Sequence, residues 1–344
     1  KVFECVNNLL VDIMQSEPNV FGGKLMLLGG DWKQLLPVVK GIHGEHILGF
    51  TLKHSFLWKH FKVLRLTKNM RVEAGALEFA NFLDAVGCAS PTVQADDGTV
   101  EIAKDICTDS EGDLVEWAYG GGALSLNNCD AIKETSILTV HNDTALEINE
   151  TVLHMLPGEP VILRSTDVCA YNNTQLVLPT AIYNSITPSG LPPHMLKLKE
   201  GCMVILLRNI DVRRNLCNGT RLRVVHIEKE LLTCTNLQEG VYFGDTVLLP
   251  RIEMEPQDKI DPSSHFKRTQ FPVRLAYCLT INKAQGQSLR KVGIVLRSPV
   301  FTHGQLYVAL SRARTMDGVR VYQYDKLPDR SLRVYNRVYK NILF

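Results

Sequence analysis

The chain has 344 residues, of which 45% are hydrophobic and 22% are charged, and its formal net charge at pH 7 is only +2. These fractions are ordinary for a soluble globular protein, and a length of this order favours two or three domains. A near-neutral total neither requires nor excludes a nucleic-acid partner, because a basic groove can be local.

Nine cysteines are present, and no two are spaced as Cys-x-x-Cys. An odd count without metal-ligand spacing argues against a disulfide framework or a zinc ribbon, and favours a reducing compartment such as the cytosol or nucleus. No apolar run approaches the roughly 20 residues that a membrane-spanning helix needs, so we expect no membrane partner. No signal peptide is recognisable. The chain begins at Lys1 rather than methionine, which suggests a fragment.

The first predicted element is a buried parallel strand over residues 25–31, an apolar run that ends in two glycines and Asp31. Ligands of open α/β sheets bind at such strand ends; an ordinary core strand with a turn is the alternative. Residues 137–140 predict a second buried strand. A helix is expected after it, because Thr144 and Glu147 have capping-box spacing. Together they predict a strand–helix unit of a Rossmann-like or RecA-like layer.

The sequence changes character near Ala181. The stretch 182–193 is rich in proline and predicts a linker or turn region. Asn218-Gly219 favours a tight hairpin turn between β-prone runs. We expect either a small antiparallel barrel inserted in the α/β fold or a plain β-meander. The β-prone runs are 202–207, 221–227, 231–235 and 246–252.

The α/β pattern returns from about residue 272. A strand is predicted at Val292–Leu296, a helix at His303–Arg314 and a last strand at Val319–Tyr324. The mixed basic and apolar tail from residue 330 predicts a solvated packing helix.

Four polar clusters interrupt these elements and carry the candidate chemistry. In chain order they read Gly29-Gly30-Asp31-Trp32-Lys33-Gln34-Leu35-Leu36-Pro37, Leu66-Thr67-Lys68-Asn69-Met70-Arg71, Leu279-Thr280-Ile281-Asn282-Lys283-Ala284-Gln285-Gly286-Gln287-Ser288, and Gln305-Leu306-Tyr307-Val308-Ala309-Leu310-Ser311-Arg312-Ala313.

These four segments, in this order, resemble helicase motifs three to six of the Pif-one family, a superfamily-one group that includes the helicases of Helitron transposons. The stretch Gly190-Leu191-Pro192-Pro193-His194 is similar to the family too, and so are Leu206-Leu207-Arg208-Asn209 and Leu216-Cys217-Asn218-Gly219-Thr220-Arg221. The likeness covers nearly the whole chain. Each motif alone is short, but six in the right order are specific.

The resemblance implies an α/β protein of the P-loop NTPase type, with two RecA-like helicase lobes and an inserted SH3-like β-barrel. It implies an ATP-dependent 5′-to-3′ DNA helicase that uses ATP and Mg²⁺ and acts as a monomeric motor on single-stranded DNA and duplex junctions. The expected location is the nucleus, with the mitochondrion as the alternative. The expected domains are 1–66, the remnant of the first lobe; 67–180, the first part of the second lobe; 181–271, the inserted 2B-type domain; and 272–344, the last part of the second lobe.

By the same resemblance, Gln34 matches the γ-phosphate sensor, and Arg71 and Arg312 match the arginines that the second lobe directs at the phosphates. These three are the predicted catalytic residues. Gln285 and Gly286 would join them in contacting nucleotide, since backbone at a glycine can approach a phosphate closely. Arginine suits phosphate because its planar fork makes paired charge-assisted bonds. The alternatives are a glutamine that satisfies a turn and two arginines in surface ion pairs.

The predicted DNA contacts are Thr280, Asn282 and Lys283, whose hydroxyl, amide and ammonium groups can bind a backbone without reading sequence. Arg208 and Arg221 of the insert are further candidates, with a solvated charge cluster as the alternative. No metal ligands are predicted. The histidine pairs 43 and 46, and 54 and 60, lack matching cysteine or carboxylate spacing.

The departure from the family is at the front of the chain. A phosphate loop needs Gly-x-x-x-x-Gly-Lys followed by Ser or Thr, but the only Gly-Lys is Gly23-Lys24, and Leu25 follows it. The Asp-Glu pair that would hold Mg²⁺ is also absent from these residues. We therefore expect part of an intact helicase that is inactive alone. The alternative is a decayed transposon-derived protein that at most binds DNA or is structural. A nuclease would need clustered carboxylates for metal.

Overall fold

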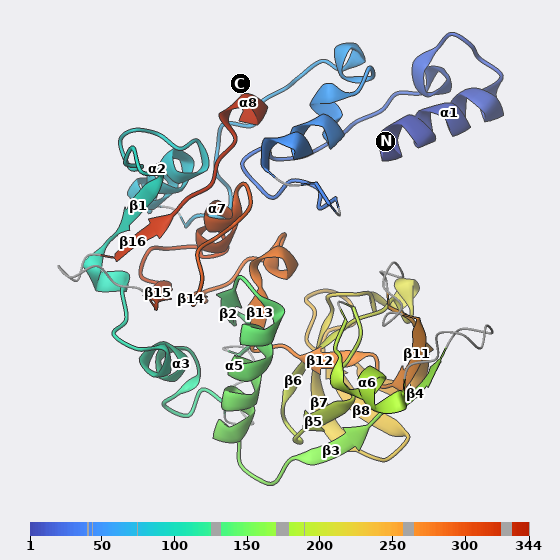
Figure 1. Cartoon of the computed structure of the whole chain (residues 1–344), viewed down its shortest axis with the longest axis vertical. Coiled ribbons are helices and arrows are strands. Elements are labelled where there is room, and N and C mark those ends of the chain that lie inside the picture. Colours follow the sequence, from blue (N-terminus) through green and yellow to red (C-terminus); the bar gives the residue numbers. More distant parts are fainter. Residues whose placement is uncertain are drawn as a thin grey trace. The chain divides into compact units, whose positions relative to one another are not determined.

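The computed structural model describes the chain except for residues 40, 43, 74, 125–131, 170–178, 189, 257–264, 325–331 and 344. Its contacts divide into two compact units, and each is described by itself (Figure 1). Unit 1 consists of Lys1–Glu111 with Ala284–Phe344, and unit 2 is Gly112–Lys283. The four domains predicted from the sequence divide the chain at other points and stay a prediction.

Unit 1 contains a parallel strand pair and an antiparallel one. Strands β14 (Lys291–Leu296) and β15 (Val319–Gln323) run parallel, and α7 (Gln305–Leu310) lies in the crossover that a parallel connection requires. Both strands were predicted and are confirmed. The other helices and strands of this unit are α1 (Val2–Met14), α2 (Leu77–Gly87), β1 (Thr99–Ile102), β16 (Leu332–Tyr335) and α8 (Lys340–Leu343).

The buried strand predicted over residues 25–31 is wrong for this chain. These residues belong to no strand, and the side chains of Leu25 and Leu27 are 98% and 91% exposed. An apolar strand is stable only where neighbouring strands bond its backbone and cover its faces. No described strand pairs with this segment.

Two predicted helices of unit 1 are also corrected. Helix α7 covers Gln305–Leu310 rather than the predicted His303–Arg314. After Ser311 the amides bond three residues back, from Arg312 to Ala309 and from Ala313 to Leu310, so the α-helical pattern stops. The tail from residue 330 forms β16, antiparallel to β1, before the short α8. Burial alternates along β16, and a period of two suits a strand rather than a helix.

Unit 2 contains a parallel pair beside a helix. Strand β2 (Thr135–Thr139) is buried along its whole length, which confirms the strand predicted there, and it pairs with β13 (Cys278–Thr280). Helix α5 (Asn142–Met155) follows β2. It begins two residues before Thr144, which is already helical and buried, so the predicted capping box is wrong. Helix α3 (Glu111–Tyr119) precedes these elements.

Most other strands of unit 2 form antiparallel sheets in the orders β12-β6-β7-β8-β9, β10-β11-β4 and β3-β5 (Figure 1). The run β6 to β9 is a meander that β12 extends at its free edge. All four predicted β-prone runs are strands. The bounds are β3 Val161–Arg164, β4 Thr166–Cys169, β5 Met195–Leu198, β6 Met203–Leu206, β7 Arg221–Ile227, β8 Leu231–Asn236, β9 Thr246–Pro250, β10 Ile252–Met254, β11 Phe266–Gln270 and β12 Val273–Leu275, with the short helix α6 at Thr180–Ser185.

The predicted tight hairpin at Asn218-Gly219 is a longer connection. Strands β6 and β7 pair, but the chain makes an excursion over residues 207–220 between them, with an isolated bridge from Asp211 to Leu216. Gly219 lies at the end of this excursion, with φ +98°, and its amide donates to the Leu206 carbonyl at 2.9 Å. The Asn-Gly turn therefore closes a loop rather than a two-residue hairpin.

A buried ion pair holds the β4–β11 sheet to the proline-rich segment. The Arg268 side chain is fully buried, and it bonds both oxygens of Asp167, its cross-strand partner, at 2.9 and 2.6 Å. Its other N–H groups donate to the carbonyls of Tyr183, Ile186 and Pro192. All five guanidinium N–H groups are thus used, as a buried charge requires.

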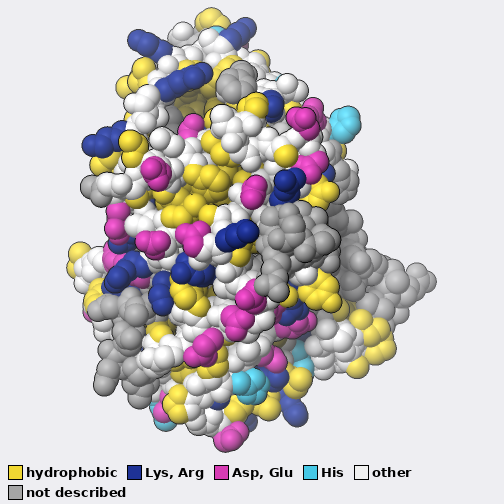
Figure 2. All heavy atoms as spheres, turned by 90° about the vertical axis from the view of Figure 1, so that its left-hand side faces the viewer, with side chains coloured by type: hydrophobic (Ala, Val, Ile, Leu, Met, Phe, Trp, Pro, Cys, Tyr) yellow, Lys and Arg dark blue, Asp and Glu magenta, His cyan; other side chains and the backbone are white. Residues whose placement is uncertain are grey.

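The face of the molecule in Figure 2 shows no large patch of side chains of one charge. Lys and Arg side chains alternate with Asp and Glu across the face shown, in keeping with the small net charge. Within the described residues, no helix is both long and apolar enough to cross a bilayer.

Candidate functional site

The Asp31 carboxylate is the centre of a hydrogen-bonded chain in unit 1. It accepts from the Lys33 amide at 3.0 Å, from the Gln34 side-chain amide at 3.1 Å and from the Tyr307 hydroxyl at 3.2 Å. The Gln34 carbonyl oxygen in turn accepts from the Gln285 amide at 3.1 Å. Two predicted nucleotide residues, Gln34 and Gln285, are therefore in direct contact although 251 positions separate them.

Residues next to α7 fix the loop that carries Gln34. Gly304 has φ +72°, and a Cβ there would overlap the Lys33 carbonyl oxygen, so only glycine allows this approach. The fully buried His303 receives the Tyr339 amide on Nδ1 at 2.8 Å, so its Nε2 donates to the Trp32 carbonyl at 2.7 Å. Burial lowers the pKa of His303, which favours this neutral form.

The two predicted arginines lie on either side of Ser311. Arg71 is half-buried; its Nε donates to the Ser288 hydroxyl at 3.0 Å and its Nη1 to the Ser311 carbonyl at 3.3 Å. Arg312 is fully buried and donates to the Ser311 hydroxyl at 2.8 Å, to the Val308 carbonyl and to the Gln287 carbonyl.

This arrangement keeps two like charges close together. Burial, together with the charge of Arg71, lowers the pKa of Arg312 to about 10. Neither arginine forms an ion pair with a carboxylate in the described part of the chain. Two adjacent guanidinium groups without an acidic partner favour a multiply charged anion, and Arg71 is the more accessible of the two.

Gly286 follows Gln285 in an exposed position. Its φ is +87°, and a Cβ built there would meet no atom within 4 Å. The backbone conformation, rather than crowding, requires the glycine. Gln287 and Ser288, the next two residues, contact Arg312 and Arg71 as described above, so the segment 285–288 connects Gln34 to both arginines.

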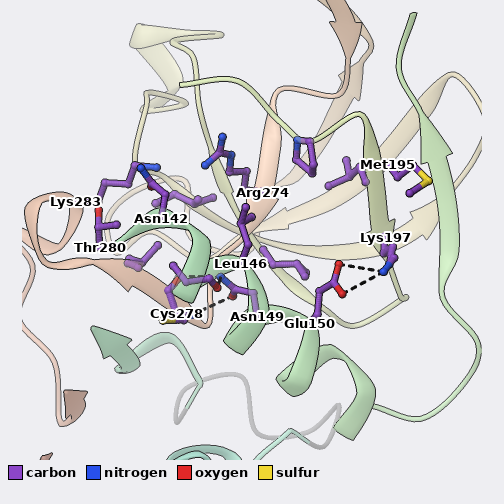
Figure 3. Close-up of a pocket in the computed structure, with 16 residues that line it drawn as sticks. Asn142, Leu146, Asn149, Glu150, Met195, Lys197, Arg274, Cys278, Thr280 and Lys283 are labelled. Carbon is purple, nitrogen blue, oxygen red and sulfur yellow. Dashed lines mark hydrogen bonds and ion pairs between the residues drawn. The ribbon is translucent and has the colours of Figure 1, made fainter. Parts of the chain in front are cut away.

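The predicted DNA contacts Thr280 and Lys283 belong to unit 2 and lie where β13 ends. Thr280 is the last residue of the strand, and Lys283 follows in a short 3₁₀ turn, Ile281–Ala284. Both line a cavity of about 120 Å³ that Arg274 also borders (Figure 3). Burial and the nearby Arg274 charge lower the pKa of Lys283 to about 8. Asn282, also predicted, is exposed.

A buried asparagine of α5 positions this strand end. The Asn149 amide nitrogen donates to the carbonyls of Ala145 and Cys278, both at 2.7 Å. Its carbonyl oxygen accepts from the amides of Tyr277 and Cys278 at 2.9 and 3.0 Å. The side chain therefore joins α5 to the backbone of β13 just before Thr280.

Arg221 is corrected as a DNA contact. It is 6% exposed, and its guanidinium donates to the carbonyls of Lys133 and Thr135 at 2.7 and 3.3 Å. Burial lowers its pKa. Arg208 is half-buried and donates to the Leu207 and Glu255 carbonyls, so its DNA role stays a prediction.

Sequence reasoning did not identify the roles of His303 and Asn149. Neither lies in a recognisable spacing pattern, and each acts through backbone contacts that only the fold creates. In the described residues, no three His, Cys, Asp or Glu side chains are grouped to hold a metal ion. His43, one of the histidines considered above, lies outside the described residues.

Comparison with known proteins finds two family models in this chain. One, described as "PIF1-like helicase", matches residues 1–95, and the other, "DNA helicase Pif1, 2B domain", matches residues 182–227. The ATP-dependent DNA helicases PIF1 of Rattus norvegicus and Homo sapiens are each 29% identical over 91% of this chain. The chain spans 43% and 42% of the length of these relatives.

Solved structures share the fold, including its RecA-like and SH3-like parts. The crystal structure of Pif1 helicase from Candida albicans matches 99% of this chain and 71% of its own, with a TM-score of 0.66 and 22% identity. Pif1 helicase from Bacteroides, in complex with ADP-AlF3 and ssDNA, matches 96% of this chain and 69% of its own, with a TM-score of 0.63 and 24% identity. Two family models and relatives along nine tenths of its length therefore show that the chain is similar to PIF1-like helicases.

Proposed function

We propose that this chain is the DNA-gripping and nucleotide-sensing part of an ATP-dependent 5′-to-3′ DNA helicase that acts as a monomer on single-stranded DNA. The observation that carries the proposal is the end of β13, where Thr280 and the half-buried Lys283 border a cavity. Arg274 also lines this cavity, but it is 6% exposed and donates to the carbonyls of Leu191 and Pro188, so Lys283 is the residue that offers its charge to a ligand. A lysine beside the Thr280 hydroxyl and the Asn142 amide offers one charge and neutral hydrogen-bonding groups, a combination that suits a phosphate backbone. The ATP-dependent DNA helicases among its relatives support the same function.

For the nucleotide, we propose that Arg71, Arg312 and Gln34 respond to the γ-phosphate of ATP bound with Mg²⁺. The Gln34 amide bonds Gln285 while Asp31 holds it, so a change at the phosphate can reach the segment 285–288 through one hydrogen bond. That segment also contacts both arginines. Loss of the phosphate charge would release the arginines and the glutamine together.

These 344 residues contain neither a Gly-x-x-x-x-Gly-Lys sequence nor an Asp-Glu pair. The first supplies the backbone cradle and lysine of a phosphate loop, and the second supplies the Mg²⁺ ligand and the carboxylate that activates water. We therefore propose that the polypeptide alone binds DNA but does not hydrolyse ATP.

DNA binding is tested by titrating a fluorescent dT oligomer with the purified chain at several salt concentrations. Lys283→Ala is expected to raise the Kd about tenfold, since a charge-assisted bond to phosphate is lost. The slope of log affinity against log salt concentration should become less negative by about 0.7. The matched control Lys229→Ala removes an exposed lysine of the same unit and should change neither quantity. Equal affinities for the wild type and Lys283→Ala would reject the proposed grip.

The pH dependence of binding follows from the pKa of Lys283. In the free protein that pKa is lowered to about 8, so the side chain loses its charge as pH rises through 8. Phosphate favours the charged form, so binding takes up a proton above pH 8, and affinity should fall about tenfold by pH 9. Lys283→Arg stays charged, so its oligomer affinity should be nearly constant from pH 7 to pH 9. A wild-type affinity that does not change over this range would contradict the assignment.

A further inference from the structure

Helix α7 reaches the loop of Gln34 through the side chain of Tyr307. The Tyr307 hydroxyl donates to Oδ2 of Asp31 at 3.2 Å, and the Gln34 side-chain amide donates to the same oxygen at 3.1 Å. The other oxygen, Oδ1, accepts from the Lys33 backbone amide at 3.0 Å. The carboxylate is therefore held from two directions, by the backbone of its own loop and by the tyrosine of α7.

The ring of Tyr307 is fixed independently of its hydroxyl. Helix α7 lies beside α2 (Figure 1), and a Cβ built on Gly87 of α2 would lie 2.9 Å from Cδ2 of the ring and 2.9 Å from Cδ of Lys33. The glycine thus leaves the space that both side chains fill. Burial, together with the charge of Asp31, raises the pKa of Tyr307, so the hydroxyl keeps its proton and donates it to the carboxylate.

The Asp31 carboxylate determines which end of the Gln34 amide faces it. An ionised carboxylate only accepts hydrogen bonds, so the NH₂ group of Gln34 faces Asp31 and the carbonyl oxygen faces the Gln285 amide. An NH₂ group has two N–H donors, and a carbonyl oxygen has two lone pairs. The amide therefore keeps one N–H for a phosphate oxygen and one lone pair for a water molecule.

We propose that Tyr307 is a positioning residue for the nucleotide response, which holds the Gln34 amide, through Asp31, in the orientation that offers an N–H to the γ-phosphate. This role rests on the proposed function, because it takes Gln34 as the group that meets the phosphate. Arg312 lies on the same short segment, whose Ser311 amide donates to the Tyr307 carbonyl at 2.9 Å. Residues 307–312 therefore set both the glutamine and one of the two arginines.

The test measures DNA-stimulated ATP hydrolysis by a helicase that combines these residues with a phosphate loop. Tyr307→Phe keeps the ring but loses the hydroxyl, which frees Oδ2 of Asp31 to turn away, and should lower kcat about tenfold. The KM for ATP should change by less than about twofold, because the hydroxyl bonds Asp31 rather than the nucleotide. Tyr335→Phe, at an exposed tyrosine of β16, is the matched control and should change neither quantity.

The connection through Asp31 is tested by combining substitutions. In an Asp31→Ala background, Tyr307→Phe should not lower kcat further, because its hydroxyl then has no carboxylate to hold. Equal losses in the two backgrounds would overturn the positioning role, and so would a lower kcat that is matched by a large fall in the melting temperature of the 344-residue chain.

The same kinetics separate this role from the proposed function. If Gln34→Ala lowers kcat but Tyr307→Phe does not, the positioning role is wrong and the proposed function stands. An unchanged kcat in Gln34→Ala would overturn both, because Gln34 would then not respond to the phosphate.

Discussion

Replacing Arg71 with alanine is expected to lower ATP turnover about 10³- to 10⁵-fold in a helicase that combines these residues with a phosphate loop. Arg71 is the more accessible of two adjacent guanidinium groups, and within the described residues its guanidinium donates to the Ser288 hydroxyl and the Ser311 carbonyl. Water can replace Arg71 at both groups, so the substitution should lower the rate of ATP hydrolysis and leave the stability of the fold nearly unchanged. The measurement is the kcat of DNA-stimulated phosphate release.

Arg312 should behave differently because it is also part of the core. Arg312→Ala should lower turnover as well, but it removes one donor each from the Val308 and Gln287 carbonyls and should reduce thermal stability. Arg213→Ala removes an exposed arginine of unit 2 and is the control for loss of a positive charge. If Arg71→Ala kept turnover within tenfold of wild type while ssDNA affinity stayed the same, the arginine-finger assignment would be wrong.

Replacing Arg268 with alanine is expected to destabilise unit 2 by about 3–5 kcal/mol, because it leaves the buried Asp167 carboxylate without its partner. The same change removes the donor from three backbone carbonyls of the proline-rich segment. A unit of this size should then melt roughly 10 °C lower. Differential scanning calorimetry of the purified chain measures the shift.

The neighbouring Lys267 provides a matched control on the same strand. It is exposed and pairs with Glu253 at the surface at 2.7 Å, so Lys267→Ala should leave the melting temperature nearly unchanged. Equal shifts for the two variants would show that strand position, rather than the buried pair, determines the effect.

Sequence patterns predicted β2 and the meander β6 to β9 of unit 2, and the β14–β15 pair of unit 1, because these elements find their partners within the chain. The same reasoning was wrong at residues 25–31, where the apolar pattern is that of a buried strand but no described strand lies beside it. It was wrong again in the tail, where basic residues suggested a helix and alternating burial shows a strand. The spacing of apolar residues shows which secondary structure a segment is able to form. Whether a strand forms also depends on a neighbouring strand that pairs with its backbone.

For the site, motif resemblance identified the residues but not their surroundings. It grouped Gln34 with Gln285 and Arg71 with Arg312, and the structure brings each pair together. It could not separate a buried arginine from a free one, so Arg221 was assigned to DNA although its charge is used on backbone carbonyls. Burial depends on distant segments, which no local motif encodes.

The central claim is that these residues grip a single strand and sense ATP without supplying its phosphate cradle. It is tested most directly by measuring ATP hydrolysis by the purified chain with a saturating dT oligomer whose binding is verified in the same sample. We predict a strand-bound protein whose rate of phosphate release equals the rate without protein. Hydrolysis that the oligomer stimulates, and that Arg71→Ala abolishes, would contradict the account, because the catalytic lysine and acid pair would then have to lie within these 344 residues.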